Sequence, residues 1–416
     1  MARIYVETYG CWLAKADAEI IRQRLGYERA DGVEEADLVL IYTCAVREDG
    51  EVRQLARIKE IAALGKDVIV AGCLARLRPY TVKTLAPRAK LLYPSEVEGG
   101  REREMKILPR YEGGLIYTVP LQVGCLGNCT FCATKYTRGG AGYVKSADPD
   151  EVVRRVKEAV SRGAREIYLT GQDVITYGFD VRWRTGWNLP DLLEKILREV
   201  EGEYRVRIGM SEPWVFEKFA DQLLDVVKRD ARVYRYFHLP VQSGSDRVLR
   251  AMGRRYTVYE YRALVNKIRR ELGSTVFIAT DIIVGFPGET EEDFADTVKL
   301  VEELQFDKVH VARFSPRPFT EAAVMPQQVP DAEKKRRSKI LSEIALKIAH
   351  LRNGLRVGQK DTVLVDEVDH GLVIGRASDY REVVVKRGSG DWLMGDFVDV
   401  KLVAAGPVYL YGELIE

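Results

Sequence analysis

The chain has 416 residues, of which 64 are Lys or Arg and 62 are Asp or Glu, so its formal net charge is only +2. This length implies two or three domains, and 46% hydrophobic with 30% charged residues is typical of a folded protein with a substantial core. The charge balance excludes a protein that is basic throughout, but it is compatible with a local basic patch for nucleic acid.

The beginning of the chain, MARIYVETYGC, lacks the charged and apolar segments of a secretory signal. No apolar run reaches the roughly 18 residues that a membrane span needs. We therefore expect a cytoplasmic protein without membrane contact, in a reducing compartment where cysteines are more often ligands or catalysts than disulfides. Only four asparagines occur beside many charged residues, which favours a thermophilic source.

The first 110 residues alternate strand-like and helix-like patterns. Runs rich in Val, Ile and Tyr at 3–10, 37–44 and 67–73 are typical of strands, and helical periodicity lies between them at 14–26 and 47–65. Such alternation predicts a parallel sheet with right-handed crossovers. We therefore expect an α/β, Rossmann-like domain over 1–110.

One cysteine ends or directly follows each of these strands: Cys11, Cys44 and Cys73. The carboxyl ends of parallel strands share one edge of the sheet, which is where open α/β sheets bind ligands. We therefore expect the three thiols to converge. Three thiolates suit an iron–sulfur cluster with one iron left open, and a zinc ion with a non-protein fourth ligand is the alternative.

The other three cysteines are bunched in GCLGNCTFC, as Cys125, Cys129 and Cys132. Their spacing, C-x3-C-x2-C, lets a single loop supply three corners of a cluster. A zinc ribbon would have a second Cys or His pair nearby, yet no cysteine follows Cys132 and the nearest histidine is His238. The pattern therefore favours a second iron–sulfur cluster with an open iron.

The middle of the chain repeats a strand-and-helix unit, which predicts a partial (β/α)6 barrel over 111–350. Strands are expected at 115–123, 166–173, 205–210, 236–243, 276–284 and 306–314. Helices are expected between them at 149–160, 189–200, 216–228, 258–272 and 291–304.

Polar side chains follow these strands at their carboxyl ends, where barrel active sites lie. They are Gln172 and Asp173, Ser211 and Glu212, Gln242 and Ser243, and Asp281. Any one of them could instead be a polar rim that solvates the end of a loop.

Residues 331–360 form a helical pattern with nine Lys or Arg against three acidic residues, a local charge of +6. One face of this helix could follow an RNA backbone, and a solvated basic helix is the alternative. The residues from 361 onward carry five basic and eleven acidic side chains, a charge of −6, so any RNA contact there would need a local face.

Five short strand patterns follow in the C-terminal residues 355–416. They predict an all-β barrel of the OB kind, a fold that often binds oligonucleotides. The candidate local face consists of Arg376, Arg381, Lys386 and Arg387, with Tyr380 and Trp392 as candidates for stacking on bases. We expect Trp392 to belong to the core instead.

The cysteine patterns together resemble a known family. C-x3-C-x2-C after a first barrel strand is similar to the radical S-adenosylmethionine (SAM) superfamily, and with the three upstream cysteines it resembles the radical-SAM methylthiotransferases. The motifs that carry the resemblance are TYGC, YTCAVRE, AGCLAR, TKYTRGG, HLPVQSGSDRVLRAMGRRYT, TDIIVGFPGETEEDF and FSPRPFTEAAVMPQQVP. The C-terminal region resembles the TRAM domain found at this place in the family.

The resemblance implies two [4Fe-4S] clusters and SAM as cofactors. The clusters would be held by Cys11, Cys44 and Cys73 and by Cys125, Cys129 and Cys132. Residues at the barrel mouth would bind SAM: Gly171 and Gln172 near its methionine end, Glu212 or Gln242 at its ribose, and Ser211 in the same set. A reduced cluster would cleave SAM, and the resulting 5′-deoxyadenosyl radical would remove a hydrogen from adenosine C2.

The stretch CATKYTRG points to one branch of the family. Bacterial relatives that act on isopentenyladenosine commonly have Pro at the position of Lys135. The sequence more closely resembles the archaeal and eukaryotic branch, which converts N6-threonylcarbamoyladenosine of tRNA to its 2-methylthio form. Lys135 and Arg138 would then contact the substrate carboxylate. Isopentenyladenosine, or an aspartate of a ribosomal protein, is the alternative substrate.

The expected partners are the anticodon stem-loop of tRNA and a flavodoxin- or ferredoxin-like electron donor, with the chain acting as a monomer. Two positions depart from the family pattern. Many relatives have Asn where this chain has Ala14 and Tyr42. Lost amide hydrogen bonds there would change the tuning of the N-terminal cluster, although all three of its thiol ligands are present.

Overall fold

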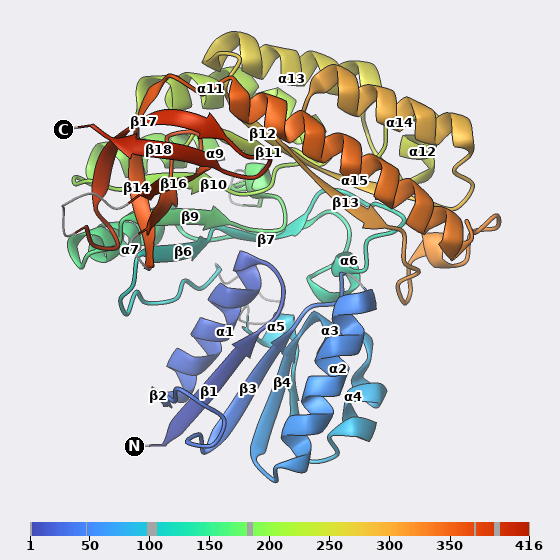
Figure 1. The fold of residues 1–416 in the computed structure, drawn as a ribbon. Helices are drawn as coiled ribbons and strands as arrows, with labels where there is room; N and C mark the ends of the chain where they lie inside the picture. The colour runs from blue at the N-terminus through green and yellow to red at the C-terminus, as the bar shows by residue number, and fades with distance from the viewer. Residues whose placement is uncertain are drawn as a thin grey trace.

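The first sheet of the computed structural model is parallel and has five strands in the order β2-β1-β3-β4-β5 (Figure 1). The structure describes residues 2–46, 48–97, 106–180, 186–369, 372–386 and 392–415. The elements of this domain are β1 (Arg3–Thr8), α1 (Trp12–Leu25), β2 (Glu28–Arg29), β3 (Leu38–Thr43), α2 (Glu48–Ala63), β4 (Asp67–Gly72), α3 (Cys73–Leu77), α4 (Pro79–Leu85), β5 (Lys90–Leu92) and α5 (Pro94–Val97).

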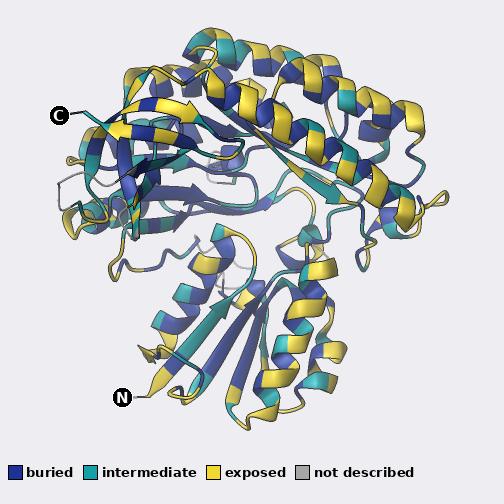
Figure 2. Ribbon diagram, in the orientation of Figure 1, coloured by how far each residue is buried: buried dark blue, intermediate teal, exposed yellow. Residues whose placement is uncertain are grey.

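The central strands β3 and β4 are almost continuously apolar, as strands covered by helices on both faces should be. Figure 2 shows them as the buried centre of the domain, with helices that expose only their outer faces. The carboxyl ends of β1, β3 and β4 point toward the second domain (Figure 1). The parallel α/β sheet predicted from the sequence is confirmed.

The second domain is a partial barrel of six parallel strands with helices outside. Its strands are β6 (Ile116–Pro120), β9 (Glu166–Thr170), β10 (Arg205–Ile208), β11 (Tyr236–His238), β12 (Phe277–Val284) and β13 (Lys308–Arg313). They form two three-stranded sheets, β10-β9-β6 and β11-β12-β13. An isolated bridge joins Val206 of β10 to Val233, which lies shortly before β11. The described residues of β6 and β13 do not pair, so the barrel is partial, as predicted.

Five long helices follow the strands as expected, and α15 comes after the last strand. They are α7 (Pro149–Ser161), α9 (Leu189–Glu199), α11 (Ala220–Arg229), α13 (Val258–Leu272), α14 (Glu291–Leu304) and α15 (Asp331–Gly354). Local sequence sets several of their starts, because Asn188, Thr257 and Thr290 each form a capping box with the acidic residue three positions later. Shorter elements are α6 (Thr134–Thr137), η1 (Val174–Thr176), α10 (Pro213–Phe216), η2 (Glu217–Phe219), α12 (Asp246–Ala251) and η3 (Glu321–Ala323).

One strand prediction was too simple. The run expected as a single strand over 115–123 splits at Leu121, whose N–H donates to the Thr170 carbonyl. Beyond this point the chain forms β7 (Gln122–Cys125), which pairs in antiparallel fashion with β8 (Tyr143–Ser146). The first strand therefore ends in a hairpin that carries the compact cysteine loop away from the barrel wall.

The C-terminal domain is a closed five-stranded barrel in the order β14-β15-β16-β18-β17, as the sequence predicts. Its strands are β14 (Lys360–Asp369), β15 (Leu372–Arg376), β16 (Glu382–Lys386), β17 (Phe397–Ala405) and β18 (Leu410–Leu414). Trp392 packs against its core, which confirms the expectation for that residue. No helix in the described part of the chain is long and apolar enough to cross a membrane.

Three arginines of the basic helix α15 pair with acidic residues of the same domain, and two of these pairs are buried. Arg337 pairs with Glu289 at 2.6 Å, Arg352 with Asp307 at 2.9 Å, and Arg336 with Glu291 at 2.6 Å. Among the described residues, Lys335, Lys339 and Lys347 are exposed without an ion pair. The charge of +6 therefore overstates the basic surface that this helix offers to RNA.

The local RNA-binding face expected in the C-terminal barrel is wrong for the residues that the structure describes. Arg381 is buried and pairs with Asp307 of the second domain. Tyr380 packs its ring on Tyr234 and Tyr236, at centroid distances of 5.0 and 4.9 Å. These residues join two domains instead of facing solvent.

The remaining members of that face do not restore it. Arg376 pairs with Asp366 at 2.9 Å and with Glu382 at 3.1 Å. Arg387 and the side chain of Lys386 lie outside the described residues. A count of charged residues in the sequence could not show which of these side chains would form ion pairs at the domain interface.

Candidate active site between two cysteine trios

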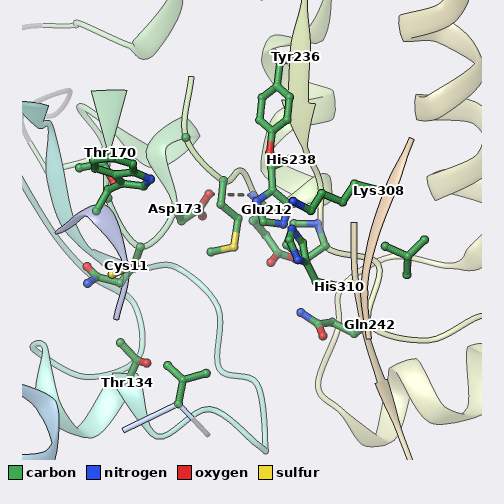
Figure 3. A pocket seen from close by; sticks show the side chains of 18 of the residues that line it. Cys11, Thr134, Thr170, Asp173, Glu212, Tyr236, His238, Gln242, Lys308 and His310 are labelled. Carbon is green, nitrogen blue, oxygen red and sulfur yellow. Dashed lines mark hydrogen bonds between the residues drawn. The ribbon is translucent and has the colours of Figure 1, made fainter. Parts of the chain in front are cut away.

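All six cysteines line one cavity of about 1070 Å³ at the junction of the first two domains. Three come from the edge of the first sheet and three from the loop after β7. Figure 3 shows Cys11 and Thr134 on one side of this cavity and His238, Lys308 and His310 on the other. The convergence of separate strand ends on one site, expected from the sequence, is present in the structure.

The N-terminal trio stands where three parallel strands end. Cys11 is the N-cap of α1, Cys44 follows β3, and Cys73 is the first residue of α3. Gly72 precedes Cys73 with φ of +92°, and a Cβ there would collide with the Thr43 backbone. Loss of solvation raises the pKa of Cys11, although the residue is still exposed, and it raises the pKa of Cys44 to about 11. A bound metal group would favour the thiolate form of both.

The barrel trio is held by one loop and by contacts to a distant segment. The Gly127 N–H donates to Cys125 Sγ at 3.2 Å, and Arg254 Nη1 donates to Cys129 Sγ at 3.3 Å. Thr130 fixes the loop through a 3.0 Å bond from its N–H to the Met252 carbonyl. Burial raises the pKa of Cys125 and of Cys129, as in the first trio.

The spacing of the sulfur atoms bears on which metal group fits. A zinc ion with Zn–S bonds of about 2.3 Å holds its sulfurs about 3.8 Å apart. Among the described residues, the group of three or more ligand side chains whose atoms all lie within 4.8 Å of one another is His238, Asp281 and His310, not a cysteine trio. In neither trio, therefore, do all three sulfur atoms lie within 4.8 Å of one another, as ligands of a single ion would.

Two predicted cofactor-binding residues contact the barrel trio or its support. Gln172 accepts a 2.6 Å hydrogen bond from the N–H of Gly124, the residue before Cys125. Glu212 pairs with Arg254 at 2.8 Å, and both side chains are almost fully buried. Arg254 therefore contacts both a cluster thiol and a predicted SAM-binding carboxylate.

Asp173 lies beside the same trio and is 1% exposed. Burial, with a smaller effect from Glu212, raises its pKa to about 8. One of its carboxylate oxygens accepts from the Glu212 N–H at 2.8 Å, and the other lies 3.9 Å from Cys125 Sγ. This carboxyl adjoins the position where a bound cluster would carry charge.

The remaining predicted cofactor-binding residues are Gly171, Gln242 and Ser211. Gly171 and Gln242 line the cavity, and a Cβ at Gly171 would meet Gln122 at 2.9 Å. Gln242 has a φ of +73° and a buried Oε1 without a hydrogen-bond partner. Ser211 is buried at 2% exposure, and its Oγ also lacks a partner. Two buried acceptors without partners are a signal of a missing ligand.

The two predicted substrate-binding cations already have partners. Arg138 pairs with Asp17 at 2.8 Å and donates to the Tyr42 hydroxyl at 3.0 Å. Lys135 donates to Asn128 Oδ1 at 2.7 Å and lies 3.5 Å from Glu321. Both line the cavity, yet Arg138 is 3% exposed and serves the domain interface.

Asp17 is the centre of that interface. It is fully buried and also pairs with Lys106 at 2.9 Å. Burial alone would raise its pKa, but Lys106 and Arg138 lower it below the usual value. Tyr42 donates to Asp17 at 2.8 Å, so this tyrosine, where the family resemblance predicts asparagine, has a structural role. Ala14 is buried, and its N–H donates to the Cys11 carbonyl at 2.9 Å.

Sequence analysis missed several side chains of this cavity. Arg254 gave no signal beyond its place in a family motif. Arg207, His238, Lys308 and His310 lie on β10, β11 and β13 or next to them, and they line the lumen. Alternation along a barrel strand points every second residue inward, and applying it to each strand would have found them.

Three known family models match three successive parts of the chain. Residues 3–93 match the Uncharacterized protein family UPF0004, residues 119–301 match the Radical SAM superfamily, and residues 354–415 match the TRAM domain.

Full-length relatives extend this result. A protein of Pyrococcus horikoshii named probable threonylcarbamoyladenosine tRNA methylthiotransferase is 37% identical over the whole of both chains. One of the same name from Methanocaldococcus jannaschii is 38% identical, covering 99% of this chain and 97% of the relative. A tRNA-2-methylthio-N(6)-dimethylallyladenosine synthase of Dictyoglomus thermophilum is 35% identical, covering 100% and 99%.

The fold has a solved counterpart. The radical S-adenosylmethionine methyltransferase TsrM of Kitasatospora setae, solved with cobalamin and a [4Fe-4S] cluster, has a TM-score of 0.57 to this chain. The two chains are 14% identical, and the alignment covers 78% of this chain and 77% of the other. This likeness concerns the fold alone.

Proposed function

Because the chain belongs to the radical SAM tRNA methylthiotransferase family, we propose that it replaces the C2 hydrogen of N6-threonylcarbamoyladenosine in tRNA with a methylthio group. The observation that carries the proposal is the placement of two cysteine trios, from different domains, on one cavity. A cavity of about 1070 Å³ is large enough for a nucleoside and a drug-sized cofactor together.

Each trio suits a [4Fe-4S] cluster with one open iron. The sulfur atoms of neither trio all lie within 4.8 Å of one another, and the raised pKa values of Cys44 and Cys129 suit thiols that become thiolates on binding a metal group. We assign one cluster to Cys11, Cys44 and Cys73 and another to Cys125, Cys129 and Cys132. When bound, these clusters and SAM supply the radical chemistry, sulfur and methyl group that acid–base side chains cannot provide.

The chain's own residues bind and orient these groups. We assign SAM to the space beside the barrel trio, where Gly171, Gln172, Glu212 and Gln242 line the cavity and the buried Oγ of Ser211 lacks a partner. Arg254 holds Glu212 in place and donates to Cys129. Burial raises the pKa of Glu212, and Arg254 counteracts that rise and would offset thiolate charge. The first domain lies over the barrel mouth and places its cysteine trio on the same cavity as the barrel trio.

We infer that the partner is the anticodon stem-loop of a cytoplasmic tRNA. The match to a TRAM domain supports RNA binding. The chemistry also requires an electron donor, for which a flavodoxin- or ferredoxin-like protein is the proposed class. The two domains that supply the trios belong to one chain, so we propose that a monomer suffices.

Isopentenyl-type adenosine is the second candidate substrate, because the Dictyoglomus thermophilum relative named for dimethylallyladenosine is 35% identical over nearly the same length. The two substrates differ in the charge of the group attached to the adenine, which a binding site can distinguish. The threonylcarbamoyl group ends in a carboxylate, whereas the dimethylallyl group is a hydrocarbon. Polar and cationic residues in the lumen favour the first substrate.

Nucleoside mass spectrometry of tRNA from cells with and without the chain tests this proposal. We expect the 2-methylthio form of threonylcarbamoyladenosine to disappear without the chain, while the unthiolated nucleoside accumulates. Loss of a methylthiolated isopentenyl nucleoside would favour the second candidate. An unchanged tRNA profile with a lighter ribosomal protein would point to the aspartate-modifying reaction.

A further inference from the structure

The lumen of the barrel contains an arginine without a carboxylate partner. Among the described residues, Arg207 makes no ion pair, and its buried Nε has no hydrogen-bond partner. Its guanidinium lies 4.8 Å from the ring centroid of Tyr168, 4.6 Å from that of Tyr236 and 4.9 Å from that of Tyr380. Tyrosine faces position a cation without neutralising it, so the charge of Arg207 stays available to a ligand.

A second cation lines the same wall. Lys308, at the start of β13, faces the cavity and forms no ion pair with a described residue. It lies close to His310 in Figure 3. Burial lowers the pKa of His310, with smaller contributions from Lys308 and Arg207, so both cations act on the same part of the lumen.

Among the described residues, the acidic groups nearby form no ion pair with either cation. Glu166 is buried close enough to Arg207 to interact with it: burial raises the pKa of Glu166 to about 7, while Arg376 and Arg207 act to lower it. Asp307 is bound by Arg352 and Arg381, and Oδ1 of Asp281 lies at hydrogen-bond distance, 2.9 Å, from Nε2 of His238. His238, Asp281 and His310 could hold a metal ion by spacing alone. Two unpaired cations beside them make this wall a better host for an anion than for a divalent cation.

We propose that Arg207 and Lys308 form the subsite that receives the carboxylate of the threonylcarbamoyl group, which makes them specificity-determining residues. This inference rests on the proposed function. It assigns substrate recognition to residues other than Lys135 and Arg138. Arg138 is already paired with Asp17, and Lys135 already contacts Asn128 and Glu321. Tyr380, which reaches in from the C-terminal barrel with a φ of +71°, closes the subsite and packs against Arg207.

The test is RNA binding by the cluster-loaded protein without SAM, under anaerobic conditions. The probes are three anticodon stem-loops that differ only in one adenosine: threonylcarbamoylated, unmodified, or carrying the methyl ester of the threonyl group. We expect wild-type protein to bind the first about tenfold more tightly than the other two, because one charge-assisted contact is worth at least that factor. Lys308→Gln and Arg207→Gln should each bind the first as weakly as wild type binds the ester.

Controls separate the subsite from other causes. Lys299→Gln removes an exposed lysine of α14 outside the cavity and should retain the wild-type preference, and Lys308→Arg should retain part of it. Arg207→Gln disturbs the tyrosine cage, so Lys308→Gln decides the matter if the arginine variant fails to fold. If Lys308→Gln instead weakens the binding of all three RNAs by the same factor and reduces the dependence of affinity on salt concentration by about one counterion, Lys308 contacts a phosphate. This result overturns the subsite.

The two proposals fail in different ways. If wild-type protein methylthiolates the threonylcarbamoylated stem-loop but Lys308→Gln and Arg207→Gln keep its binding preference, the subsite is wrong and the function stands. If wild-type protein binds that stem-loop with preference but never methylthiolates it, the proposed reaction is wrong. Equal wild-type affinity for all three RNAs overturns the subsite directly.

Discussion

The two cysteine trios reach one cavity by different routes. The barrel trio comes from a single loop in which spacing alone keeps Cys125, Cys129 and Cys132 together. The N-terminal trio comes from three strand ends that only the parallel sheet brings together. Their surroundings also differ, because Arg254 donates directly to a thiol of the barrel trio, whereas Thr137 of the barrel domain donates to Cys73 at 3.3 Å.

This difference shows how the work is divided between the domains. The barrel trio and the residues proposed to bind SAM lie within one domain and could assemble without the other. The N-terminal trio depends on the barrel domain for Thr137 and for the ion pair between Arg138 and Asp17. Damage to the interface should therefore affect the N-terminal cluster first.

The largest expected effect comes from removing one trio at a time. Replacing Cys125, Cys129 and Cys132 by Ala should lower the iron content after anaerobic reconstitution from about eight to about four per chain and abolish SAM cleavage. Replacing Cys11, Cys44 and Cys73 should lower iron equally but leave 5′-deoxyadenosine formation intact. Iron assays and chromatography of the nucleoside products check both results. If the second variant also loses SAM cleavage, the two trios are not independent.

A smaller contrast is expected at the arginines. Arg254→Gln leaves Glu212 as an uncompensated buried charge and should cost about 3 kcal/mol of unfolding free energy. Arg138→Gln should cost less, because Asp17 keeps its 2.9 Å pair with Lys106. Anaerobic denaturant titration of the reconstituted variants measures both costs. Equal losses would show that the two arginines do not differ as the structure indicates.

The buried carboxyl groups of Asp17 and Asp173 should make the free energy of unfolding depend on pH in opposite directions. The pKa of Asp17 is lowered, so its contribution is present above its unfolded pKa of about 3.9 and is lost as pH falls through the folded value. The pKa of Asp173 is raised to about 8, so its contribution is present at low pH and is lost as pH rises through that value.

Urea unfolding of the cluster-free chain across pH measures these slopes. Asp17→Asn should flatten the acid side of the stability profile, and Asp173→Asn should flatten the approach to pH 8. A profile that neither variant changes would contradict the assigned charge states.

The smallest effect is expected at Tyr42, where the family resemblance predicts asparagine. Tyr42→Phe removes one hydroxyl from the group that joins Asp17 and Arg138. The two charged residues keep each other, so the loss should be about 1 kcal/mol. Thermal melting of the variant beside wild type checks this value. A loss as large as that of Arg138→Gln would mean that the hydroxyl, not the ion pair, holds the interface.

Local patterns in the sequence predicted what depends on neighbours in the chain. Strand periodicity placed Cys11, Cys44 and Cys73 at strand ends, and the rule for parallel sheets then brought them to one edge. Contacts between residues that are far apart in the sequence could not be predicted in this way. Nothing near Arg254 in the sequence indicates that it contacts Cys129, which lies 125 positions away.

Charge counts failed for the same reason. Arg352 and Arg381 come from segments of opposite net charge, and both are buried on Asp307. Only the fold shows which cations are paired and which, such as Arg207 and Lys308, face the cavity without a described carboxylate partner.

The central claim is that two clusters facing one cavity modify a carboxylate-bearing adenosine. The most direct test gives the anaerobically reconstituted chain SAM, a reductant and two tRNAs, one with threonylcarbamoyladenosine and one with isopentenyladenosine, and analyses the nucleosides by mass spectrometry. The account predicts the 2-methylthio product from the first tRNA and little from the second. Formation of 5′-deoxyadenosine with no methylthio group on either nucleoside, or methylthiolation of the isopentenyl nucleoside alone, would contradict it.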